Sequence, residues 1–215
     1  MNPVILQAEV ADTSIKLIPL LMKGGVVMIP LLFLSVIALI IIIERLMFFS
    51  QNLKTSKKTF EKFATAFSQG KNQEAEQIAS AEKTSWGRVF VYATISGQMS
   101  GAEMDKVMED AGAVEISRLE KNLNYLSMIA GLAPLLGFIG TIAGVITIFY
   151  SISTTQDISI SSITEGLYQK MVTSAAGLFV GIIAFTAHQL FQNRIDQFIA
   201  KMQEESLLIR VSSKK

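Results

Sequence analysis

Three long apolar stretches limit what this chain can fold into. They cover residues 26–49, 125–152 and 164–190, and the middle stretch contains no charged residue. A helix rises about 1.5 Å per residue, so about 20 residues cross the hydrocarbon core of a bilayer. Because a spanning backbone must satisfy its own hydrogen bonds, we predict an all-α integral membrane protein with three transmembrane helices.

The segment between the first two spans has a different character. Residues 50–124 contain ten Lys and Arg residues, a similar number of acids, and apolar residues at helical spacing. This pattern predicts a helical domain whose helices are continuous with the spans. Glycines at 70–72 and 97–101 predict breaks. We expect the charged helix 103–121 to run straight into the second span.

The distribution of basic residues predicts the orientation. Fifteen of the nineteen Lys and Arg residues lie in 50–124 or after Leu190, and none lies in the loop 153–163. The positive-inside rule therefore places the 50–124 domain and the C-terminal helix 191–215 in the cytoplasm. Residues 1–25 and the loop would be periplasmic. Within 1–25 we predict a surface-lying amphipathic helix over 14–23, a frayed tail being the alternative.

Composition excludes several classes of function. A net charge of +1 gives no excess to neutralise phosphates, which argues against nucleic acid. The chain has no cysteine, and its only histidine is His188, so we expect no disulfide, metal or other cofactor. The spans contain no nucleophile–base pair, which makes an intramembrane enzyme a distant alternative. We interpret His188 as a polar residue at the inner interface. The first charge, Glu9, follows no basic region, so we expect no cleaved signal peptide.

Proline and glycines shape the second and third spans. Pro134 removes one backbone hydrogen bond and predicts a kink or a hydrated carbonyl. Small residues four apart allow another helix to approach closely, and tight packing alone explains them. The residues assigned to helix shaping and packing are Pro134, Gly137, Gly140, Gly144, Gly177 and Gly181.

Hydroxyl residues are the candidates for a proton path. Thr141 in the second span and Thr173 and Ser174 in the third fall at similar depths when residues are counted from opposite ends. One such hydroxyl usually bonds only the carbonyl of the preceding turn. Two sites at one depth on adjacent spans leave the pore-lining and back-bonding interpretations equally open.

Polar residues also mark the outer and inner ends of the spans. Glu165, Gln169 and Lys170 form an outer polar stripe on the third span, although Lys170 could instead snorkel to the interface. Glu44 and Arg45 end the first span at the inner interface. Because adjacent residues do not share a helix face, we expect each to pair with a different element.

The spans lack a group that could carry the proton. No carboxylate occurs between Lys121 and Asp157, or between Glu165 and Asp196. Hydroxyls do not titrate near neutral pH, whereas a proton relay requires a titrating group. If protons cross here, another chain must supply that group.

Several motifs resemble a known family. The pattern Ala133-Pro-Leu-Leu-Gly-x-x-Gly-Thr-x-x-Gly resembles the second span of the ExbB/TolQ/MotA proton-channel proteins. Met171-Val-Thr-Ser-Ala-Ala-Gly-Leu resembles their third span. Gly24-Gly25-x-x-Met28-x-Pro30 and the Glu44-Arg45 pair resemble the start and end of the first span in ExbB. The domain 50–124 agrees in size and helical character only.

The resemblance implies a bacterial inner-membrane motor. It implies a homopentamer around a central pore that holds single-span helices of an ExbD-like partner, whose aspartate titrates. The residues that match Thr141 and Ser174 would face this aspartate, and proton flow would drive rotation and work on a TonB-like periplasmic protein. One position departs from the pattern, because Gln169 aligns with a glutamate of some members and Glu165 lies one turn further out.

Rival functions remain. A TolQ-like role in envelope constriction or a MotA-like role in motility keeps the mechanism, although the large cytoplasmic insertions of motility proteins are absent. A non-conducting membrane scaffold is the other alternative. The scaffold predicts no proton flux and no acidic single-span partner.

Overall fold

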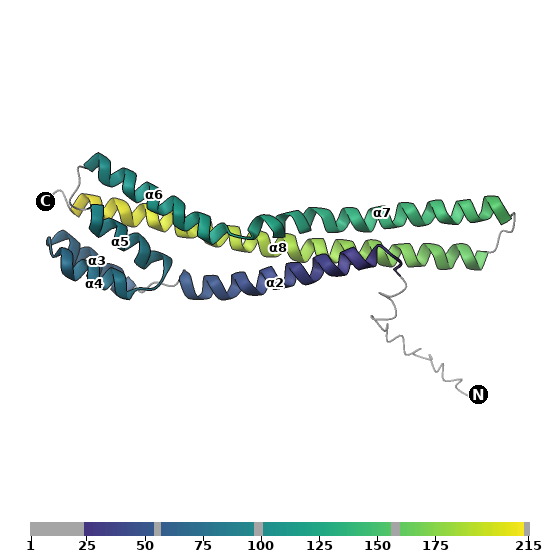
Figure 1. Cartoon of the computed structure of the whole chain (residues 1–215), viewed down its shortest axis with the longest axis horizontal. Coiled ribbons are helices and arrows are strands. Elements are labelled where there is room, and N and C mark those ends of the chain that lie inside the picture. The colour runs from purple at the N-terminus through teal and green to yellow at the C-terminus, as the bar shows by residue number, and fades with distance from the viewer. Residues whose placement is uncertain (1–23, 54–56, 97–100, 156–159, 213–215) are drawn as a thin grey trace, which may run out of the picture. The chain divides into compact units, whose positions relative to one another are not determined.

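The computed structural model describes residues 24–53, 57–96, 101–155 and 160–212, and these ranges hold helices and no strand (Figure 1). The predicted all-α class is therefore confirmed. The N-terminal amphipathic helix predicted over 14–23, and most of the break predicted at 97–101, lie outside the described residues. The helices are α2 (Met28–Asn52), α3 (Lys57–Ser68), α4 (Asn72–Ala81), α5 (Ser85–Ser96), α6 (Gly101–Glu120), α7 (Leu123–Thr155) and α8 (Ile160–Ser212).

Three helices are long and apolar enough to cross a membrane, as predicted. They are Met28–Asn52, Leu123–Thr154 and Ile163–Leu207, with mean hydropathies of 2.6, 2.1 and 1.6. The third segment has 45 residues, about 68 Å of helix, which is twice the thickness of a bilayer core. Neither Gly nor Pro occurs after Gly181 to end it. The helix α8 therefore continues beyond a span such as 164–190, as expected.

The junction between α6 and α7 differs from the prediction. We expected the helix 103–121 to continue into the second span, but α6 ends at Glu120 and α7 begins at Leu123. Asn122 has a φ of 66°, the left-handed conformation that asparagine tolerates best after glycine. Two residues, Lys121 and Asn122, therefore separate the two helices where the hydrophobic pattern showed no break.

The break predicted at 70–72 is confirmed. Gly70 has a φ of 72°, its N–H donates to the carbonyl of Phe67 at 3.0 Å, and the N–H of Lys71 donates to Ala66 at 3.0 Å. This pair of bonds is the Schellman motif, in which glycine closes the C-terminus of a helix. It lets α4 turn back onto α3.

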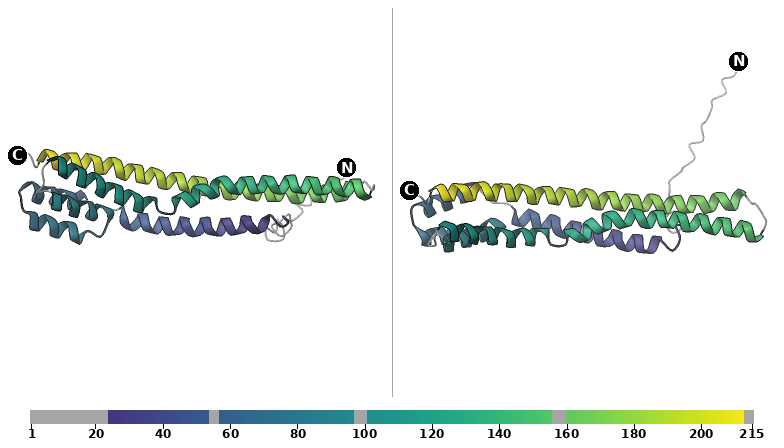
Figure 2. Two further views of the ribbon diagram at one scale, coloured as in Figure 1. Left: turned by 45° about the horizontal axis from the view of Figure 1, so that its top comes forward. Right: turned by 90° about the horizontal axis from the view of Figure 1, so that it is seen from above.

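The chain divides into two compact units, and α2, α7 and α8 each contribute to both. The first unit comprises residues 24–34 and 132–180 of the described chain. Its core joins Met28 and Leu31 of α2 to Ala133 of α7, with Ala176 and Val180 of α8 packed against them. Within this unit α7 and α8 run side by side in opposite directions (Figure 2).

The second unit, residues 35–131 and 181–212, has an aromatic core. The Phe63 and Phe90 rings stack with centroids 4.5 Å apart, and Trp86 meets Phe198 of α8 edge-on at 4.9 Å. Such pairs favour offset or edge-to-face geometry and add stability beyond area burial. Within this unit α5 and α6 thus pack against the C-terminal part of α8, and α3 packs against α5 (Figures 1 and 2).

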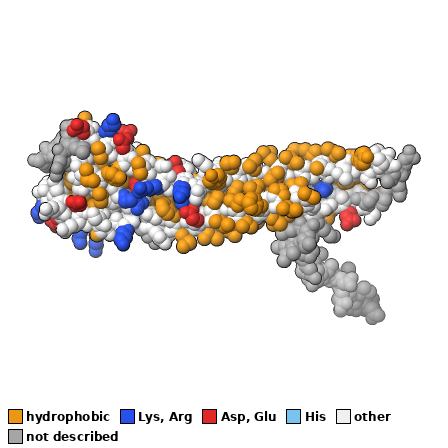
Figure 3. All heavy atoms as spheres, in the orientation of Figure 1, with side chains coloured by type: hydrophobic (Ala, Val, Ile, Leu, Met, Phe, Trp, Pro, Cys, Tyr) orange, Lys and Arg blue, Asp and Glu red, His pale blue; other side chains and the backbone are white. Residues whose placement is uncertain are grey.

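Surface composition separates the membrane helices from the remainder. On the face drawn, apolar side chains cover much of α2 and α7, whereas Lys, Arg, Asp and Glu gather over α3 to α6 (Figure 3). Large exposed residues include Phe138 at 59% and Phe149 at 66% exposure. Apolar faces of this extent mark contact with lipid or with other protein chains.

Glu205, on the part of α8 that follows the predicted span 164–190, predicts a pH effect on stability. Burial raises the pKa of its carboxyl to about 7, although Lys201 opposes the shift, and its Oε2 is buried without a hydrogen-bond partner. Below pH 4.5 the group is neutral in the folded and unfolded chain, so it costs nothing. Between pH 4.5 and 7 the unfolded chain ionises this carboxyl while the folded chain keeps it protonated, so stability falls across that window and stays lower above pH 7.

We therefore expect Glu205→Gln to raise the melting temperature at pH 8 and to leave it unchanged at pH 4.5, measured on the full chain in detergent. The exposed Glu76→Gln should change neither value. An equal effect of Glu205→Gln at both pH values would contradict this assignment.

Candidate functional site

Glycines bring α7 and α8 into backbone contact in the first unit. A Cβ on Gly177 would lie 2.6 Å from the carbonyl oxygen of Ala133 and 3.0 Å from the Cα of Gly137. A Cβ on Gly137 would lie 3.1 Å from the Cα of Ser174. Real Cβ atoms do not approach backbone so closely, so only glycine permits this helix separation. These contacts are those expected of the packing role predicted for Gly137 and Gly177.

The same contacts define the register of the two helices. Gly140 faces the methyl group of Thr173, and Gly144 lies against the aliphatic stem of Lys170. Thr141 follows Gly140, so the three hydroxyls lie within about one helical turn along the axis. The register of α7 and α8 agrees with the predicted similarity in depth, which itself stays a prediction. The helix α7 continues through Pro134 without interruption, and Gly181 is buried.

The three hydroxyls have different partners within one chain. Thr141 is part-exposed and donates to the carbonyl of Phe138 at 2.6 Å. Ser174 is part-buried, and no hydrogen bond joins its hydroxyl to another described residue. Thr173 is fully buried and donates to the carbonyl of Gly24 at 2.7 Å. Their role in a proton path stays a prediction, with Thr141 and Ser174 the more accessible.

Thr173 anchors the start of the first span. Its bond to Gly24 crosses from α8 to the turn before α2, where Gly25 has a φ of 78° and accepts a bond from the N–H of Met28 at 3.0 Å. That φ favours glycine because a Cβ would be strained there. The Gly24-Gly25 motif thus makes a tight turn, and the Thr173 hydroxyl donates a hydrogen bond to its Gly24 carbonyl.

The residues of the outer polar stripe differ in how far their side chains are exposed. Glu165 is exposed, whereas Gln169 and Lys170 are part-buried. The Gln169 Nε2 and the Lys170 Nζ both lie 3.6 Å from where a Cβ of Gly25 would be. The two side chains therefore extend toward the Gly24-Gly25 turn. Among the described residues, Lys170 forms no ion pair.

The inner-interface pair corrects a prediction. Glu44 and Arg45 were expected to pair with different elements, but they pair with each other, the Arg45 Nε donating to Glu44 at 2.6 Å. The long arginine side chain folds back along α2, which compensates for the angle between adjacent positions. Arg45 also donates to the carbonyls of Arg118 and Leu119 on α6, so its second contact is with another helix, as expected.

A buried carboxylate that sequence patterns did not reveal organises the second unit. Glu115 on α6 has a 1% exposed side chain and accepts bonds from Arg88 of α5 at 2.9 Å and from Arg118 at 2.6 Å. Arg88 also reaches Asn52 at 3.4 Å. The three-residue spacing of Glu115 and Arg118 indicates an ion pair on one helix face. No local pattern links Glu115 to Arg88, which lies 27 residues earlier.

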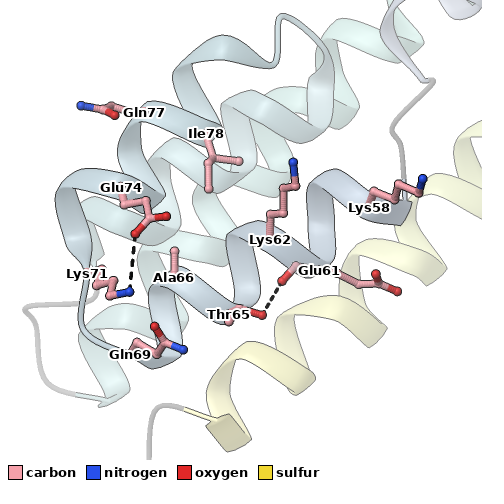
Figure 4. A pocket seen from close by; sticks show the side chains of 10 residues that line it. All are labelled: Lys58, Glu61, Lys62, Thr65, Ala66, Gln69, Lys71, Glu74, Gln77 and Ile78. Atoms are coloured by element: carbon pink, nitrogen blue, oxygen red, sulfur yellow. Dashed lines mark hydrogen bonds and ion pairs between the residues drawn. The ribbon is translucent and has the colours of Figure 1, made fainter.

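A cleft of about 650 Å³ opens between α3 and α4 (Figure 4). Charged and amide side chains line it, including Lys62, Lys71 and Glu74, the last two forming an ion pair at 3.8 Å. Both partners are more than half exposed, so this pair contributes little to stability. The lining is that of a solvated surface. Among the described residues, no cluster of His, Cys, Asp and Glu could hold a metal ion.

Comparison with known proteins identifies the family. The sequence model of the MotA/TolQ/ExbB proton channel family matches residues 71–204, which is more than half of the chain. The chain belongs to this family. The matched range contains α7, the membrane part of α8 and every hydroxyl candidate. It therefore covers the glycine contact and leaves α2 outside.

Relatives within the MotA/TolQ/ExbB family carry two kinds of name. The putative biopolymer transport protein ExbB-like 1 of Synechocystis sp. is 30% identical over 203 residues, which cover 91% of this chain and 80% of the relative. The biopolymer transport protein exbB1 of Vibrio cholerae is 26% identical, with 81% and 78% covered. The Tol-Pal system protein TolQ of Pseudomonas aeruginosa is 31% identical over 48% of each chain. The protein is thus an ExbB/TolQ-type membrane protein.

Proposed function

We propose that this protein is the channel subunit of an ExbB-like motor in the bacterial inner membrane. It uses the proton motive force to do work through a TonB-like periplasmic partner and so energises outer-membrane transport. The active assembly is a homopentamer with an ExbD-like single-span partner inside the ring. The subunit is not an enzyme and needs no cofactor, and protons are the transported ions. Its N-terminus is periplasmic and its C-terminus cytoplasmic.

This proposal rests on one observation: hydroxyl side chains lie at the same level of α7 and α8, and no carboxylate of the described residues lies at that level. Ser174 lies at the glycine contact of α7 and α8, Thr141 follows Gly140 on α7, and neither hydroxyl residue is fully buried within one chain. Polar groups inside a membrane protein generally face a pathway or a neighbouring helix. Because hydroxyls do not titrate near neutral pH, the aspartate of the partner must hold the proton as it passes.

The test is proton flux through the chain reconstituted with its acidic single-span partner. We expect Thr141→Val and Ser174→Ala each to lower flux by about tenfold, equivalent to about 1.4 kcal/mol, the contribution of one hydrogen bond in a dry site. Valine and alanine preserve the shape of the helices, so assembly with the partner should be unchanged.

Thr147→Val is the matched control. Thr147 lies on the same helix and is exposed, and its hydroxyl donates to the carbonyl of Ala143 at 2.8 Å. This variant should conduct normally. Wild-type flux in both Thr141→Val and Ser174→Ala would remove the hydroxyls from the mechanism, and the absence of flux in the wild-type complex would favour a scaffold.

A TolQ-like output is the second candidate, favoured by the likeness to TolQ of Pseudomonas aeruginosa. It differs from the first in the periplasmic protein that receives the work. Co-purification of a TonB-like rather than a Tol partner with the intact complex distinguishes the two outputs.

A further inference from the structure

Arg45 is a buried cation at the inner end of the first span. Its side chain is 2% exposed, and its guanidinium carbon lies 4.6 Å from the centre of the Phe48 ring. Two of its nitrogens, Nε and Nη2, donate to the two carboxylate oxygens of Glu44. This fork geometry balances the charge within α2 and holds the guanidinium in one orientation.

The third nitrogen of Arg45 reaches the end of α6. Its Nη1 lies 3.3 Å from the carbonyl oxygens of both Arg118 and Leu119. The last four carbonyls of a helix lack partners within the helix, and α6 ends at Glu120. Arg45 therefore caps α6 from a different helix.

The cap lies beside a left-handed residue of the second unit. Asn122, two residues after α6 ends, has a φ of 66°, and α7 begins at the next residue. Lys121 and Asn122 lie beside the Glu44 carboxylate. Both members of the Glu44-Arg45 pair therefore contact the junction, one on the α6 side and one at the turn.

We propose that Arg45 is a positioning residue that locks the angle between α6 and α7. Without the guanidinium, the end of α6 would lose its cap, and the two residues between α6 and α7 would be held only by Asn122 and by the packing of the buried Leu119 and Leu123. With the guanidinium in place, the angle between α6 and α7 is fixed. The structural part of this inference is independent of proton conduction.

The functional consequence rests on the proposed function. Thr141 lies on α7, the helix that begins at this joint. A motor that does work must hold its channel helices against a load, and a free hinge at Asn122 would let α7 tilt without moving α6. Loss of Arg45 should therefore lower proton flux while the complex still assembles.

A distance measurement tests the joint directly. Because the chain has no cysteine, spin labels at Ala113→Cys on α6 and Met128→Cys on α7 report only this angle. Both positions are exposed, and 15 residues of helix separate labels by about 22 Å if straight. Labelled full-length chains are diluted into unlabelled ones in lipid nanodiscs, and electron double resonance gives the distance distribution.

We expect one narrow distribution for the parent chain and a broadened, shifted one for Arg45→Gln. Arg45→Lys should behave like Arg45→Gln, because an ammonium cannot bond the carboxylate and both carbonyls at once. It also serves as the test if Arg45→Gln does not fold. Arg194→Gln, an exposed site with the same charge change, should leave the distribution narrow. A narrow, unshifted distribution in Arg45→Gln or Arg45→Lys would overturn the proposal, whatever the flux of the wild type.

Discussion

Replacing Gly177 with alanine is expected to destabilise the membrane part of this protein more than any other single-methyl change in the spans. The new Cβ would lie 2.6 Å from the Ala133 carbonyl oxygen and 3.0 Å from the Gly137 Cα. Because both of these atoms belong to the backbone, rotating a side chain cannot relieve the clash. The helices α7 and α8 must move apart instead. Overpacking of this kind costs about 1–3 kcal/mol. The thermal unfolding of the full chain in detergent measures the loss.

Gly131→Ala on α7 is the matched control, because no atom lies within 4 Å of where its Cβ would be. Alanine is a better helix former than glycine by about 0.5–1 kcal/mol, so this variant should be neutral or slightly stabilising. The two substitutions therefore have opposite expected signs. Equal melting temperatures for both would show that the glycine contact does not determine stability.

The Gly177 variant also separates packing from conduction. The helices meet through Gly137 and Ser174 on the same face, so a wider separation should disturb the hydroxyl level as well as the fold. We expect Gly177→Ala to lower both proton flux and stability. Thr141→Val should lower proton flux and leave stability unchanged. A different pattern would place the path away from the α7–α8 contact.

Replacing Glu115 with alanine should have the largest effect in the second unit. Its buried carboxylate accepts bonds from Arg88 and Arg118, which belong to different helices. Removing one partner of a buried ion pair costs about 3–5 kcal/mol, because a charge is left without compensation. The arginines are 33% and 53% exposed, so water can partly replace the carboxylate. We therefore expect a loss of about 3 kcal/mol, near the lower end.

Thermal unfolding followed by helix content and limited proteolysis of the 50–124 domain measure this loss. Glu109→Ala provides the control, since Glu109 is exposed on the same helix and such changes fall within about 0.5 kcal/mol. Wild-type stability and protease resistance in Glu115→Ala would show that the Arg88–Glu115–Arg118 network is not required for the domain.

The spans and the glycine contact were predictable because hydrophobicity and helix period act locally. About 20 apolar residues must form a helix in lipid, and small residues four apart create a face for another helix. The break after α3 was predictable for the same reason, since Gly70 alone supplies the left-handed residue. The break at Asn122 was not, because asparagine occurs in helices as well as in turns.

The partners of charged residues could not be predicted. Helix geometry places Glu44 and Arg45 on different faces, and only the flexibility of the arginine side chain brings them together. In the sequence Glu115 is one of several acids of the charged helix 103–121, and its bond to Arg88 of α5 spans 27 residues. Contacts across such separations follow from packing of whole helices, which no local pattern encodes.

The amino-acid sequence by itself determined that the chain crosses a membrane three times, which residues permit close helix contact, and that no carboxylate lies at the hydroxyl level. These properties depend on residue type and on spacing along one helix. Only the tertiary structure decided which hydroxyl is buried, that Thr173 bonds Gly24 instead of remaining open, and that Arg45 caps α6. Each of these depends on the distance between helices remote in sequence, which is set by how closely the glycine faces and aromatic core allow them to pack.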